Sequence, residues 1–79
     1  MEEPKIKIDI RNMPITTERL KKVSKELDKI EPGEYAEIVA DDERMLQLAP
    51  KMIKSIGKAD FIKSWKEEDG FYHTLVKRK

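Results

Sequence analysis

The hydrophobic pattern of the chain changes period once within its first thirty residues. Isoleucine occupies every second position from Ile6 to Ile10, with charged side chains between. This alternation is typical of a strand with one buried and one solvated face, and it predicts a strand over 5–10. From Leu20 to Ile30 the apolar residues recur at steps of three, four and three, the spacing of one helical face. The chain is therefore restricted to folds in which helices pack on a sheet.

The first helix has a clear beginning and end in the sequence. Pro14 favours an extended residue before it, and Thr16 or Thr17 can then accept hydrogen bonds from the first turn of the helix. Pro32 and Gly33 follow the last apolar position and turn the chain. We therefore expect the helix to occupy most of the segment between these signals.

The rest of the chain predicts a second helix and three more strands. Residues 35–40 are apolar on both faces, which favours a central strand. Asp41 or Asp42 is expected to cap a helix over about 43–56, and Pro50 is expected to kink or split it. Residues 59–65 and 71–77 alternate like strands, and the intervening Asp69-Gly70 predicts a hairpin.

The expected fold is α+β, a two-layer sandwich of the order β-α-β-α-β-β. The first strand has one wet face, so both helices are expected on the same side of a four-stranded mixed sheet. With 79 residues, the chain 1–79 is expected to form a single domain.

Composition excludes several classes of protein. Charged residues make up 42% of the chain, but 17 Lys and Arg against 16 Asp and Glu leave a net charge of only +1. Any nucleic-acid face must therefore be a local patch. The chain has no cysteine, which excludes thiolate nucleophiles and Cys-ligated zinc. The abundance of lysine and glutamate is typical of proteins from hot environments.

We expect neither a membrane-spanning segment nor a signal peptide. The sequence contains no run of about 18 apolar residues, and an acidic segment such as 1–5 is not typical of a signal peptide. We expect a cytoplasmic location.

Several short motifs lie at the ends of the expected strands and helices. Pro50 follows Asp42 by eight residues, and the chain ends on a basic strand. The motifs are Ile8-Asp9-Ile10-Arg11, Pro32-Gly33-Glu34, Ala40-Asp41-Asp42, Asp69-Gly70 and Leu75-Val76-Lys77-Arg78-Lys79. In their order and spacing, these motifs resemble the TusA/SirA-like family of small sulfur-carrier proteins, and the resemblance covers nearly the whole chain.

The resemblance implies a persulfide relay toward tRNA thiolation or another acceptor. In the family, a Cys-Pro-x-Pro motif at the start of the first helix carries the sulfur, where the helix N-terminus favours a thiolate. The corresponding stretch here is Met13-Pro14-Ile15-Thr16-Thr17, which has no cysteine. A threonine hydroxyl cannot take over persulfide chemistry at neutral pH. We therefore expect no catalysis, no cofactor and no metal.

The start of the first helix is the first candidate binding site. Its free backbone N–H groups can hold an anion, but threonines at this position more commonly cap a helix, and simple capping is the favoured explanation. The residues at this position are Arg11, Pro14, Thr16, Thr17 and Arg19.

Basic residues form a second candidate, a patch that could follow a phosphate backbone. The alternative is a solvated face in a charge-rich protein. The residues are Lys51, Lys54, Lys58, Lys77, Arg78 and Lys79.

Aromatic residues near the hairpin are a third candidate, because exposed rings on a sheet can stack unpaired bases. Alternation sends Phe71 and His73 to one face and Tyr72 to the other, so not all of them can be exposed. His73 has no metal-ligand spacing to Asp69, and a lone strand histidine is usually a half-buried polar residue.

The sequence thus predicts a sulfur-carrier-like protein-interaction module that binds a protein partner. The alternative is an RNA- or DNA-binding domain that uses the lysine-rich helix face and the basic C-terminus. A monomer or weak homodimer is expected, because Lys63 and Lys66 protect a sheet edge.

Overall fold

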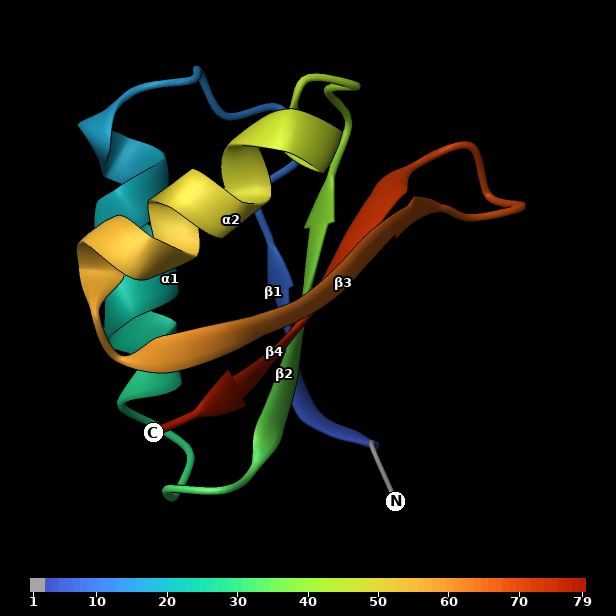
Figure 1. Cartoon of the computed structure of the whole chain (residues 1–79). Helices are drawn as coiled ribbons and strands as arrows, with labels where there is room; N and C mark the ends of the chain where they lie inside the picture. Colours follow the sequence, from blue (N-terminus) through green and yellow to red (C-terminus); the bar gives the residue numbers. More distant parts are fainter. Residues whose placement is uncertain (1–2) are drawn as a thin grey trace.

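The computed structural model describes residues 3–79 and has the predicted element order (Figure 1). Met1 and Glu2 lie outside the described residues. They belong to the segment 1–5, which is not expected to be a signal peptide. The elements are β1 (Pro4–Asp9), α1 (Thr17–Leu27), β2 (Tyr35–Ala40), α2 (Met45–Ile56), β3 (Ala59–Lys66) and β4 (Tyr72–Arg78).

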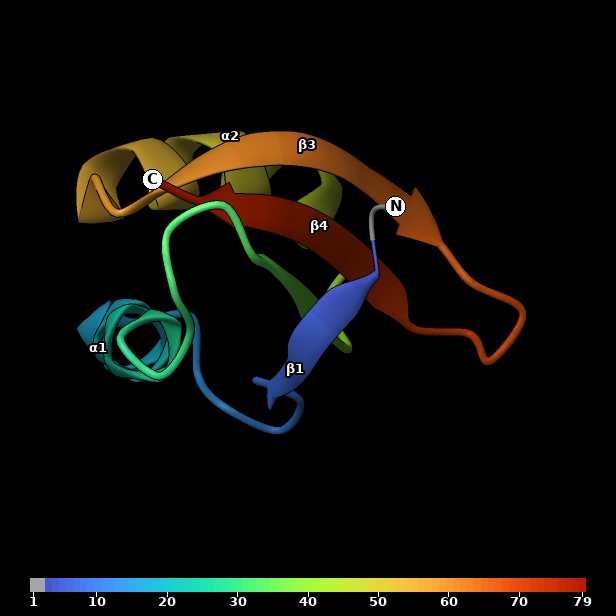
Figure 2. The ribbon, with the colours of Figure 1, turned by 90° about the horizontal axis from the view of Figure 1, so that it is seen from below.

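The strands form one mixed sheet in the order β1-β2-β4-β3 (Figure 2). β1 and β2 are parallel, joined through α1, and Ile8 lies opposite Ile38. β4 runs antiparallel to both of its neighbours, with Val76 opposite Ala36 of β2. β2 is central, as its two apolar faces predicted. The four-stranded mixed α+β fold is confirmed.

Both helices pack on one face of the sheet and share one core with it. Val23 and Leu27 of α1 are completely buried, as is Ala49 of α2. They join a single cluster with sheet residues on the face that carries Ile8 and Ile38. The helical periodicity in the sequence thus marks the residues that hold the two layers together.

The beginnings of the two helices differ. Thr16 caps α1, as predicted, and its hydroxyl accepts a hydrogen bond from the N–H of Glu18 at 3.3 Å. The predicted capping of α2 is wrong, because Arg44 is the N-cap and makes no side-chain capping bond. Asp42 instead accepts the N–H of Arg44 at 2.8 Å, and its carbonyl accepts the N–H of Met45. These bonds close a turn before the helix, so α2 begins two residues later than expected.

Pro50 does not split α2, which runs as one helix from Met45 to Ile56. Ala49 and Ile53 are buried on either side of the proline and hold both turns on the sheet. Burial therefore compensates for the backbone hydrogen bond that the proline removes. Neither helix of the described chain is long and apolar enough to cross a membrane.

Candidate functional site

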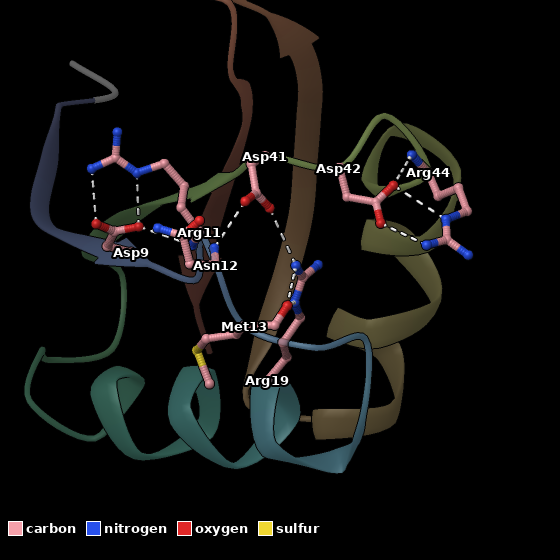
Figure 3. Close-up of polar contacts among 8 residues, drawn as sticks. All are labelled: Asp9, Arg11, Asn12, Met13, Arg19, Asp41, Asp42 and Arg44. Carbon is pink, nitrogen blue, oxygen red and sulfur yellow. Dashed lines mark hydrogen bonds and ion pairs between the residues drawn. The ribbon is translucent and has the colours of Figure 1, made fainter.

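The loop between β1 and α1 is tied to the end of β2. Asn12 adopts a left-handed backbone conformation, with φ 65°, and its N–H donates to a carboxylate oxygen of Asp41 at 2.9 Å (Figure 3). Asparagine tolerates this conformation better than most residues. The tether fixes the path of the chain from Met13 into α1.

Arg19 is the buried centre of this region, with a side chain only 4% exposed. Its Nε and Nη2 donate to the carbonyl of Met13 at 3.0 and 2.7 Å, and Nη2 also lies 3.5 Å from Asp41. Nη1 is buried and has no hydrogen-bond partner within residues 3–79. Figure 3 shows this third nitrogen on the side of the guanidinium turned away from Met13.

A groove of about 200 Å³ lies where the N-terminal half of α1 meets α2. We call it the α1–α2 groove. Its apolar lining consists of Ile15, Leu20, Met45, Leu48 and Met52. Its polar lining consists of Thr16, Arg19, Lys51 and Ser55. The polar lining therefore supplies two cations and two hydroxyls, and no carboxylate.

The structure separates the residues predicted at the start of the first helix. Thr16 and Arg19 line the α1–α2 groove, whereas Pro14 and Thr17 are exposed and do not line it. Arg11 is directed elsewhere: its guanidinium is hydrogen-bonded to Asp9 and lies 4.7 Å from the centre of the Phe71 ring. The hydrogen bonds from Arg11 lower the pKa of Asp9 to about 2.

The predicted basic patch is divided between different surroundings. Lys51 lines the α1–α2 groove, and Lys54 and Lys79 share a separate shallow pocket. Lys58 forms an ion pair with Asp28 at 3.0 Å, and Arg78 approaches the same carboxylate at 3.9 Å. Lys77 lies 5.8 Å from the Tyr35 ring centre. These residues therefore do not present one uncompensated positive surface.

The aromatic candidates are engaged within the chain. His73 is buried and lies between two carboxylates, with Nδ1 2.8 Å from Glu37 and Nε2 2.9 Å from Asp69. Trp65 stacks on the imidazole at 5.6 Å between ring centres. Burial lowers the pKa of His73, but the hydrogen bonds to both carboxylates outweigh it and raise the pKa above its ordinary value of 6.5. A protonated ring donates to both partners at once.

On the α2 side of the groove, the sequence pointed only to Lys51, as part of the basic patch. The apolar lining residues Met45, Leu48 and Met52 were not identified as part of a site. A signal was nevertheless present, because α2 carries more apolar residues than one buried stripe needs. Two large apolar side chains also remain on the surface, since Ile15 is 39% exposed and Leu46 is 36% exposed.

The groove combines an apolar lining with hydroxyl and cationic groups, an arrangement that is typical of binding sites. Its lining contains no carboxylate or imidazole beside Thr16 or Ser55. Within residues 3–79, no cluster of three or more His, Cys, Asp or Glu side chains is arranged to hold a metal ion.

No protein-family model and no curated protein matches this chain.

Proposed function

We propose that this chain is a non-catalytic protein-interaction module and that the α1–α2 groove is its docking site. The supporting observation is the groove itself, an apolar depression next to the exposed Ile15. Exposed apolar surface around a concave site is typical of binding sites for partners and ligands.

The position of the groove connects it with the sulfur-carrier resemblance. The stretch 13–17, where that family carries its cysteine, borders the groove through Ile15 and Thr16. A scaffold that keeps this surface without a thiol can dock a partner but cannot carry sulfur. We therefore propose a component of a sulfur-transfer or tRNA-modification system as the partner.

Two matched substitutions test the docking site. Ile15→Asn places a polar side chain at the groove, whereas Ile62→Asn makes the same change on β3, where Ile62 is 36% exposed. Burying such a side chain in an interface contributes about 1.5–3 kcal/mol, so its loss weakens binding roughly ten- to hundredfold.

The experiment is affinity capture from native host cells, followed by mass spectrometry and a Kd for the purified pair. Wild type and Ile62→Asn are expected to retain the same partner, and Ile15→Asn is expected to lose it. A partner that binds Ile15→Asn with unchanged Kd rules out the groove as the docking site. The purified wild type is expected to gain no sulfur from a persulfide donor.

A further inference from the structure

The unpartnered nitrogen of Arg19 distinguishes the α1–α2 groove from a purely apolar depression. Arg19 lines the groove, and its buried Nη1 donates to no atom of residues 3–79. A buried N–H that belongs to a charged group and has no acceptor is costly to fold around. An occupant of the groove that displaces the side chains covering Nη1 and brings an oxygen atom to it removes that cost, which is a source of binding energy.

The charges around the groove decide which oxygen fits. The cationic Lys51 lies on the rim, and Thr16 and Ser55 add hydroxyl groups. Asp41 meets Arg19 through Nη2, and it does not line the groove. A carboxylate is therefore the complementary group, since it accepts charge-assisted hydrogen bonds from both a guanidinium and an ammonium.

The volume decides how much apolar material accompanies the carboxylate. About 200 Å³ is somewhat larger than an apolar cavity of about 150 Å³ that takes up benzene. The space thus suits one side chain of leucine or phenylalanine size. Met45 and Met52 in the wall are flexible enough to adjust around it.

We propose that the α1–α2 groove binds the C-terminal residue of a partner chain, with its apolar side chain in the groove and its free carboxylate on Arg19. This inference rests on the proposed docking function and names the chemistry of the partner. A C-terminal residue carries both groups on one Cα, which matches a groove too small for two residues. An internal acidic residue needs a separate apolar neighbour.

Three short peptides and one small acid test the proposal by ¹⁵N chemical-shift titration of the full chain. The peptide acid Ac-Gly-Gly-Leu-OH is expected to bind and to shift Thr16, Leu20 and Leu48. Its C-terminal amide, which lacks the charge, is expected to bind at least about tenfold more weakly. Ac-Gly-Gly-Gly-OH, which lacks the side chain, is expected to show a similar loss, and 4-methylpentanoate tests whether the peptide backbone is needed.

The wild-type protein also provides a readout that needs no variant. The guanidinium N–H resonances of Arg19 are expected to move with the peptide acid and not with the amide. In Arg19→Met, the difference in Kd between acid and amide is expected to disappear. If this variant does not fold, the guanidinium resonances of the wild type decide the question.

Each contrary outcome identifies what fails. Equal binding of acid and amide, or no binding of the acid, rules out carboxylate recognition. If the small acid binds as tightly as the peptide acid, the occupant is not a chain end. Capture of a partner that is lost in Ile15→Asn, together with equal binding of acid and amide, retains the docking function and removes only this inference. Binding of the peptide acid with no captured partner supports carboxylate recognition in the groove and removes the proposed docking of a partner protein.

Discussion

Replacing Arg19 by methionine separates the contribution of this residue to binding from its contribution to stability. The substitution removes the hydrogen bonds to the Met13 carbonyl, and a hydrogen bond to a charged group contributes about 1.5–3 kcal/mol. It also removes the buried, unpartnered Nη1–H, whose burial costs about 1–3 kcal/mol. Both nitrogens donate to one carbonyl oxygen and are counted as a single contact, so the two contributions nearly cancel. Arg19→Met is therefore expected to change the free energy of unfolding by between a gain of about 1.5 and a loss of about 2 kcal/mol.

Arg19→Ala provides the comparison, because it also removes the aliphatic part of the side chain, which is only 4% exposed. Truncation of a buried methionine-sized side chain to alanine costs about 2–5 kcal/mol. The alanine variant is therefore expected to be less stable than the methionine variant by about that amount. For a domain of this size, each 1 kcal/mol lowers Tm by about 4–8 °C.

Equilibrium unfolding in urea, followed by far-UV circular dichroism, measures both variants under the same conditions. If Arg19→Met lowers the free energy of unfolding by about 3 kcal/mol or more, the full contribution of the contact with the Met13 carbonyl is lost with no offset from Nη1. The unpartnered nitrogen then carries no cost, and the reasoning that assigns it a ligand is wrong.

Three further predictions concern other parts of the molecule. The pKa of His73 is raised in the folded protein, so its protonated form stabilises the fold. This stabilisation is complete below the unfolded pKa of about 6.5 and is lost as the pH rises through the folded pKa. Urea unfolding across this pH range measures it, and a free energy of unfolding that stays constant while His73 titrates contradicts it. Met13→Cys, which recreates Cys-Pro, is expected to accept sulfane sulfur from a persulfide donor faster than the exposed control Ile62→Cys, as measured by mass spectrometry; equal rates argue against the sulfur-carrier resemblance. Because Asp28 pairs with Lys58, RNA filter binding at two salt concentrations is expected to show no retention; salt-sensitive retention that is lost in Lys58→Gln favours the nucleic-acid alternative.

Local signals predicted the fold well. The period-two isoleucines of β1 and the helical stripe of α1 depend only on neighbouring positions, and both segments form as expected. Thr16 was identified as a cap for the same reason, since a capping hydroxyl acts within one turn. Asp42 also acts locally, but the backbone geometry that selects a turn rather than a helix cap is not encoded in residue type.

The site was predicted only in part, because it depends on contacts between distant segments. Arg19 was identified from its place on α1, but its pairing with Asp41 spans 22 positions. The Glu37–His73 hydrogen bond spans 36 positions and requires the register between β2 and β4. The groove forms only where α1 packs against α2, which neighbouring positions in the sequence do not show. The charge pattern likewise did not reveal that Asp28 forms ion pairs with both Lys58 and Arg78.

Intermolecular NOEs between Ac-Gly-Gly-Leu-OH and the full chain locate the docking site most directly. We expect contacts from the leucine methyl groups of the peptide to Leu48 and Met52, in the wall of the α1–α2 groove. Contacts to Trp65 beside His73, with none to Leu48 or Met52, would place binding on the opposite face of the sheet and rule out the α1–α2 groove as the docking site.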